Sequence, residues 1–148
     1  MRKHSQITKA VIAVAGSGTR FLPATKSLPK EMLPIFDRPI VHYVVEEMVE
    51  AGITDIILVT RDDKKTLEDY FDHNVLLEQE LQRGGKLDLL EEIQRIADMA
   101  NFVYVRQKGA YGNGTPVLCV KNLVRDEPFV FAYGDDLIKS MENYARNQ

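Results

Sequence analysis

The chain has 148 residues, a length typical of one domain with a buried core, so we expect residues 1–148 to form a single domain. Its net charge of −3 gives no electrostatic reason to expect nucleic acid or an anionic membrane as a partner. Cys119 is the only cysteine, which excludes an internal disulfide and favours a cytoplasmic location, and the apolar run at 10–15 is too short for a membrane span.

Strands and helices are expected to alternate along the chain. Continuous apolar runs indicate strands buried on both faces at 10–15 and 56–60, and two further strands are predicted at 102–107 and 128–133. Apolar residues at helical spacing predict helices from Ile40 until Ala51 and Gly52, at 62–71, at 75–100 with a break at Gly84 and Gly85, and at 115–123. Pro39 stands where a first-turn proline would. This alternation predicts a three-layer, Rossmann-like α/β domain with a mainly parallel sheet.

The segment after the first strand combines glycine with positive charge. Residues 15–34 read AGSGTRFLPATKSLPKEMLP, in which Arg20, Lys26 and Lys30 supply three cations. Glycine lets main-chain amides approach a ligand closely, and successive amides form an anion-binding concavity. The segment lacks both the glycine–lysine–hydroxyl run of a P-loop and the third glycine of the dinucleotide fingerprint. It therefore predicts a polyphosphate site of a different kind.

Three polar segments follow predicted strands. They are the glycine-bearing loop at 16–30, the loop at 108–114, and the pair Asp135 and Asp136. Because the carboxyl ends of parallel strands meet at one edge of a sheet, we expect these segments to converge there and to form the binding site.

Two motifs carry a resemblance to a known family. GSGTRFLPATK at 16–26, followed by PKEMLP at 29–34, resembles the signature of the nucleotide-sugar pyrophosphorylases, and the similarity extends to Asp135 and Asp136. The resemblance implies a nucleotide-diphospho-sugar transferase fold. In the uridylyl branch of that family it implies transfer of UMP from UTP to glucose 1-phosphate, giving UDP-glucose and pyrophosphate. It also implies Mg²⁺ as cofactor, because such transfers depend on positioning and on charge neutralisation by a divalent cation.

The resemblance implies a role for each candidate site residue. Arg20 is expected to hold the β- and γ-phosphates, and Lys30 to neutralise charge near the reacting phosphorus. Asp135 is expected to bind Mg²⁺, because hard cations take carboxylate oxygens. The remaining nucleotide-binding positions are Ala15, Gly16, Gly18, Thr19, Gln107 and Gly112, of which Gln107 is expected to read the uracil edge.

Two other functions stay open. A dTTP-dependent sugar-1-phosphate thymidylyltransferase would differ only in recognising one methyl and one hydroxyl of the nucleotide. A non-catalytic nucleotide-binding module, or an incomplete fragment, is the second alternative. The resemblance ends shortly after Asp135, so the domain is expected to be truncated on its C-terminal side, where the resembling enzymes have most of their sugar pocket. A sheet edge left exposed there predicts a homodimer or larger homo-oligomer.

Overall fold

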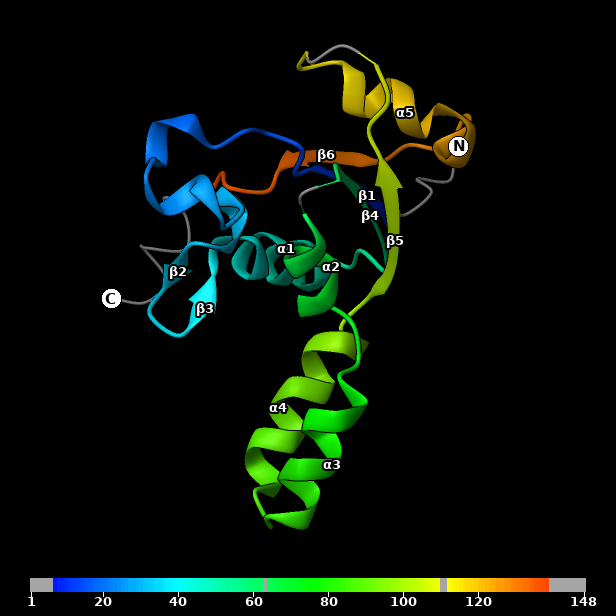
Figure 1. Ribbon diagram of the computed structural model, residues 1–148. Coiled ribbons are helices and arrows are strands. Elements are labelled where there is room, and N and C mark those ends of the chain that lie inside the picture. Colours follow the sequence, from blue (N-terminus) through cyan, green and yellow to red (C-terminus); the bar gives the residue numbers. More distant parts are fainter. Residues whose placement is uncertain (1–6, 63, 110–111, 139–148) are drawn as a thin grey trace, which may run out of the picture.

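The computed structural model describes residues 7–62, 64–109 and 112–138 of the chain. A parallel sheet of four strands, in the order β5, β4, β1, β6, forms its centre (Figure 1). The strands are β1 Lys9–Ala13, β4 Asp55–Thr60, β5 Asn101–Arg106 and β6 Val130–Tyr133. The four strands predicted from apolar runs are therefore confirmed, each with bounds shifted by no more than about two residues, the usual uncertainty of element ends.

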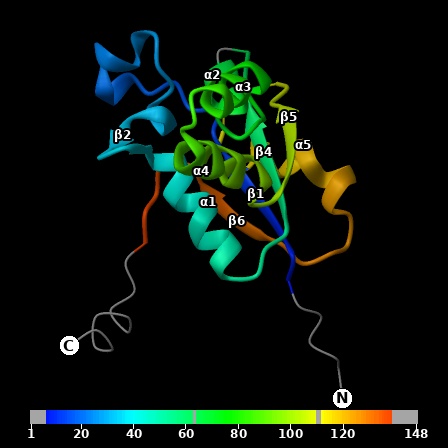
Figure 2. The ribbon, with the colours of Figure 1, turned by 90° about the horizontal axis from the view of Figure 1, so that it is seen from below.

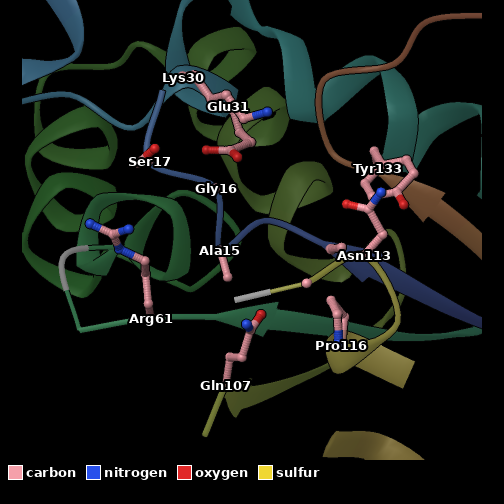
Figure 3. Close-up of a pocket in the computed structure, with 12 residues that line it drawn as sticks. Ala15, Gly16, Ser17, Lys30, Glu31, Arg61, Gln107, Asn113, Pro116 and Tyr133 are labelled. Carbon is pink, nitrogen blue, oxygen red and sulfur yellow. The ribbon is translucent and has the colours of Figure 1, made fainter. Parts of the chain in front are cut away.

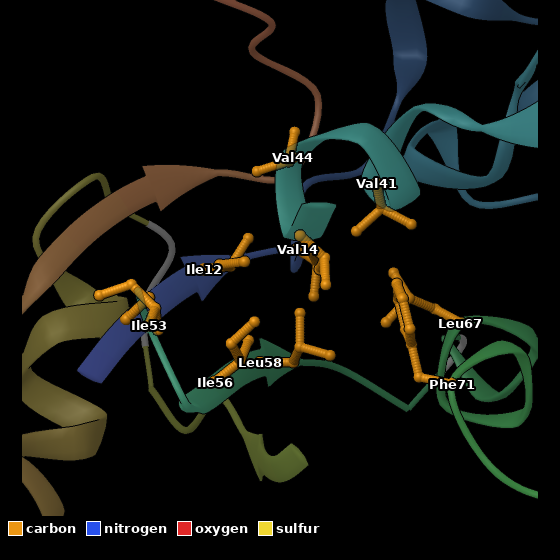
Figure 4. Packing of buried hydrophobic residues seen from close by; sticks show 11 residues of the cluster. Ile12, Val14, Val41, Val44, Ile53, Ile56, Leu58, Leu67 and Phe71 are labelled. Atoms are coloured by element: carbon orange, nitrogen blue, oxygen red, sulfur yellow. The ribbon is translucent and has the colours of Figure 1, made fainter. Parts of the chain in front are cut away.

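Alternate residues of β1 pack into two separate cores, as the two-residue period of a strand requires. Ile12 belongs to a core with residues of α1 (Ile40–Glu50) and α2 (Lys65–Tyr70), among them Val41 and Leu67 (Figure 4). Val11 packs in the opposite direction, in a core with Val120 of α5 (Thr115–Val124). Helices thus cover both faces of the sheet, which confirms the predicted three-layer α/β arrangement (Figures 1 and 2).

The strand order places a reversal next to β1. The chain passes from β1 through α1 to β4 and then to β5, moving outward in one direction, and α5 returns it across the other face to β6 on the far side of β1. In open α/β sheets, ligands bind beyond the carboxyl ends of the strands at such a reversal. The topology therefore predicts a ligand site at the edge of the sheet where β1 and β6 end.

A helical hairpin stands away from the sheet (Figure 1). It consists of α3 Val75–Arg83 and α4 Leu87–Asp98, separated at Gly84 and Gly85 as predicted. Gly85 has a φ of +68°, a conformation that favours glycine, and so ends the first helix at low cost. The Asn74 side chain accepts a hydrogen bond from the Leu77 amide at 3.1 Å and caps the start of α3.

Several local features differ from the sequence-based expectations. The helix predicted at 62–71 begins only at Lys65, with residue 63 outside the described ranges, because Lys64 adopts non-helical backbone angles. Pro39 is the N-cap of α1 rather than a first-turn residue, with extended backbone. Short elements that no periodicity predicted divide the segment after β1: η1 Thr19–Phe21, η2 Ala24–Lys26, η3 Lys30–Met32, β2 Pro34–Ile35 and β3 Arg38–Pro39.

None of the helices in the described ranges has the length and apolar character needed to cross a membrane.

Candidate functional site

The strand register places four strand ends side by side. One row across the sheet consists of Tyr133, Ala13, Val59 and Val105. Two positions further along the chain stand Asp135, Ala15, Arg61 and Gln107. Because the strands are parallel, these four residues leave the sheet at the same level of its carboxyl edge. Asp135 belongs to one of the segments predicted to converge there, and Ala15 and Gln107 directly precede the other two, so that convergence is confirmed.

A pocket of about 500 Å³ lies over this row (Figure 3). Five residues predicted for the site line it: Ala15, Gly16, Lys30, Gln107 and Gly112. In Figure 3 the Gln107 amide points toward Ala15 from one side, and Lys30 and Glu31 lie on the opposite side. The volume is in the range of several hundred Å³ that is usual for small-molecule sites.

A smaller and more polar pocket, of about 220 Å³, adjoins the first. The other predicted residues line it: Gly18, Thr19, Arg20 and Asp135. Ser17 and Lys30 line both pockets, so the two spaces meet at Lys30. The structure therefore brings every predicted site residue to one of two neighbouring pockets, the larger at the ends of β1, β4 and β5 and the smaller along the glycine-bearing loop.

Opposite charges meet where the two pockets join. Lys30 Nζ donates a hydrogen bond to Asp135 Oδ2 at 2.7 Å, although the two residues are 105 positions apart in the chain. About one fifth of each side chain is exposed, so both groups face solvent from a partly enclosed position. An ammonium in such a pair can bind a phosphate oxygen in place of the carboxylate. The carboxylate can likewise bind a metal ion in place of the ammonium.

Two glycines shape the loop around Lys30. Gly18 has a φ of +68°, and its carbonyl accepts a 2.6 Å hydrogen bond from the Thr25 hydroxyl, which holds the loop in its turn. A Cβ on Gly16 would lie only 3.0 Å from Lys30 Cε, so this glycine leaves room for the lysine stem. The glycines therefore allow the main chain and Lys30 to approach the same space.

Comparison with known families matches residues 9–147 to the family described as nucleotidyl transferase. The chain belongs to this family. It is 49% identical over 135 residues to a UTP–glucose-1-phosphate uridylyltransferase of Bacillus subtilis strain 168, a match that covers 91% of this chain and 46% of that protein. The UTP-bound UGPase from Acinetobacter baumannii is 50% identical, with a TM-score of 0.86 over 90% of this chain and 47% of that chain. The nucleotidyl transferase chain thus spans about half the length of the curated relatives it matches.

A more distant structure shares the fold of this nucleotidyl transferase. A putative glucose-1-phosphate thymidylyltransferase from Bacillus anthracis is 23% identical, with a TM-score of 0.63 over 94% of this chain and 49% of that chain. The likeness confirms the α/β architecture at low identity. The much higher identity to uridylyltransferases confirms the family resemblance carried by the motifs at 16–26 and 29–34.

The donor set of the nucleotidyl transferase fits a magnesium ion bound together with a substrate. Within the described residues, no cluster of three or more metal-ligating side chains occurs. Asp135 instead offers one carboxylate at the edge of the smaller pocket. Mg²⁺ commonly takes one or two carboxylates and completes its shell with phosphate oxygens and water, so one aspartate beside a small polar pocket suits it.

Sequence reasoning missed three charged residues of this site. Arg61 lines the larger pocket at the end of β4, the one strand end that the predicted convergence left out, and its place directly after a buried strand would have found it. Glu31 also lines that pocket, and its fully buried carboxylate accepts a 2.8 Å hydrogen bond from the ammonium of buried Lys64. Burial raises the pKa of the Glu31 carboxyl, and the nearby Lys64 charge opposes that shift. No local pattern in the sequence marks the Glu31 and Lys64 pairing.

Proposed function

We propose that the chain is the nucleotide-binding part of a magnesium-dependent UTP–glucose-1-phosphate uridylyltransferase. The observation that carries the proposal is the meeting of the two pockets at Lys30, with Asp135 2.7 Å away. A base and ribose fit the dimensions of the larger pocket, and a polyphosphate suits the polar and cationic lining of the smaller one. Identity near 50% to enzymes named for this reaction supports the choice of UTP and glucose 1-phosphate.

Six of the nine predicted site residues have an assigned task in this proposal. The Gln107 amide both donates to and accepts from the uracil edge, while the main chain at Ala15 and Gly16 contacts the base and ribose. Arg20 and Lys30 bind phosphate oxygens through charge-assisted hydrogen bonds. Asp135 holds Mg²⁺, which supplies charge neutralisation to the phosphates when bound.

The chemistry needs no nucleophilic side chain. An oxygen of glucose 1-phosphate forms a bond to the α-phosphorus of UTP, and the bond from that phosphorus to the bridging oxygen breaks, releasing pyrophosphate with the electron pair. Positioning and electrostatic stabilisation supply most of the catalysis in such transfers. Lys30, placed between the two pockets, is suited to bind the oxygens on which charge develops.

The decisive experiment measures UTP affinity and turnover with the full chain and Mg²⁺. We expect Arg20→Ala and Lys30→Ala each to weaken UTP binding about tenfold or more, because each removes a charge-assisted contact. Lys65→Met, which removes an equal charge from an exposed position on α2, is the matched control. Unchanged UTP affinity in both site variants would refute the proposed site.

Turnover separates the remaining functions. Pyrophosphate release from UTP with glucose 1-phosphate supports the uridylyltransferase, whereas preference for dTTP in competition identifies a thymidylyltransferase. UTP binding without any pyrophosphate release identifies a non-catalytic nucleotide-binding module. Varying the sugar 1-phosphate in the same assay tests the choice of glucose.

A further inference from the structure

The Glu31–Lys64 ion pair is buried beneath the site. Neither residue has more than 2% of its surface exposed, and the ammonium-to-carboxylate distance is 2.8 Å. Burying two charges costs solvation that their mutual attraction offsets only partly, so such a pair is poor evidence of a stabilising role. The second carboxylate oxygen, Oε1, is buried and makes no hydrogen bond to any described residue.

Both partners stand next to residues of the two pockets. Glu31 follows Lys30 directly within η3. Lys64 ends the turn that begins at Arg61, with its amide donating to the Arg61 carbonyl at 3.2 Å. The ion pair thus connects η3, which carries Lys30, to the residues that follow Arg61, and Arg61 lines the larger pocket.

Glu31 also packs against the segment that carries Asp135. A Cβ on Gly134 would lie 3.2 Å from Glu31 Cγ, so the Glu31 stem rests on the backbone just before Asp135. The Gly134 amide continues the β1–β6 ladder by donating to the Ala13 carbonyl at 3.0 Å. Glu31 therefore lies next to the backbone that carries Lys30 and next to the backbone that carries Asp135.

We propose that the buried Glu31–Lys64 ion pair is the positioning element of the nucleotide site, holding the segments that carry Lys30 and Asp135 next to each other where the two pockets meet. This inference rests on the proposed function for its ligand, and on geometry for the link itself. Lys64 acts through Glu31, and neither needs to touch the nucleotide. Without Lys64, the buried Glu31 carboxylate loses the ammonium that holds it and shifts, taking Lys30 with it.

A measurement without ligand tests the link. An amine-reactive acylating reagent, with mass spectrometry of the full chain, reports how fast each lysine is modified. We expect Lys64→Met to raise the labelling rate of Lys30 several-fold, because Lys30 leaves Asp135. Lys86 is exposed and lies between α3 and α4, so its rate is the internal standard. The control variant is Lys65→Met, which changes the neighbouring lysine in the same way. We expect it to leave the labelling rate of Lys30 equal to that in the natural chain.

Removing one charge of a buried pair can unfold the protein, so a double variant is measured in parallel. Glu31→Gln combined with Lys64→Met leaves no uncompensated charge but still lacks the ion pair. We expect its unfolding midpoint to recover relative to Lys64→Met while Lys30 labelling stays fast. Lys30 labelling at the natural rate in both variants would overturn the inference.

Ligand affinity supplies a second readout that general damage to the fold would not reproduce. With Mg²⁺ present, we expect Lys64→Met to weaken UTP binding about tenfold, the size of one lost charge-assisted contact, and to leave uridine binding unchanged. Equal weakening of UTP and uridine would show a merely structural role and contradict the inference. Failure of the natural chain to bind UTP would refute the proposed function, whereas Lys30 labelling still decides the positioning link.

Discussion

Lys30 Nζ and Asp135 Oδ2 form a 2.7 Å ion pair. In the function we propose, a triphosphate would compete with Asp135 for Lys30, and a metal ion would compete with Lys30 for Asp135. Binding of either ligand would separate the ion pair and leave the other charged group available to the second ligand. The proposal therefore predicts that triphosphate and metal ion increase each other's affinity.

Removal of the divalent cation tests this coupling. With a chelator present, we expect UTP affinity to fall about tenfold or more, because Asp135 then holds Lys30 and repels phosphate. Asp135→Asn should lose this dependence on the metal and bind UTP without metal at least as well as the natural chain does. Isothermal titration with and without Mg²⁺ measures both effects. An equal metal dependence in Asp135→Asn would show that the ion binds elsewhere.

Gly134 is a residue whose absent side chain matters. A Cβ there would overlap with Val14 Cγ1, well inside the contact distance of two carbons. We expect Gly134→Ala to lower the free energy of unfolding by about 1–3 kcal/mol, as overpacking of a core does. Gly114→Ala is the control, since a Cβ at that position would meet nothing within 4 Å, and its effect should stay below about 1 kcal/mol. Urea unfolding compares the two, and equal effects would contradict the steric reason.

At the scale of elements, the α3–α4 hairpin differs from the helices that cover the sheet. Every residue of α3 and α4 is described, and only Leu81 among them is buried. At its base, His73 Nδ1 lies 3.0 Å from Glu78 Oε1 and His73 Nε2 lies 3.3 Å from Asp98 Oδ1. Because Glu78 belongs to α3 and Asp98 ends α4, one imidazolium joins both helices where the hairpin leaves the domain.

This bridge predicts a pH dependence of stability. The hydrogen bond to Glu78, and after it the one to Asp98, raises the pKa of His73 in the folded state. Its stabilisation is therefore complete below the ordinary histidine pKa of about 6.5 and is lost as pH rises through the raised folded-state value. We expect the free energy of unfolding of the natural chain, minus that of His73→Gln, to be larger at about pH 5 than at about pH 8.5.

Urea unfolding at the two pH values measures that difference. Subtracting the variant removes the opposite contribution of His42, whose pKa burial lowers. A difference that does not change with pH would show that His73 makes no charged contact in solution.

At the scale of the whole molecule, β6 is one of the two outer strands of the sheet that the described residues form, and it follows the reversal of strand order. An outer strand leaves one row of backbone groups without a neighbouring strand, which favours pairing between copies. We therefore keep the prediction of a homodimer or larger homo-oligomer. Light scattering over a range of concentrations should give a mass of at least two chains, and a single-chain mass at the highest concentration would contradict it.

The four strands of the sheet, the helices α1 to α5 and the glycine-bearing loop follow from local patterns. Burial on both faces requires an apolar run, as at 56–60, and a helix covering a sheet requires apolar residues at helical spacing, as at 40–50. These signals come from residues that are close together in the chain, so the sequence shows them without knowledge of the tertiary structure. The loop at 15–34 is legible for the same reason, because its glycines and cations are contiguous.

The contacts across the site depend on strand order and register, which no local pattern contains. Arg61 joins the row with Gln107 and Asp135 only because β4 lies between β1 and β5 in this register. Glu31 meets Lys64 across 33 positions, and both read as ordinary charged residues until packing removes water from them. Charge in a sequence is a property of the residue, but the effect of a charge depends on its distance from others and on burial, and folding alone sets both.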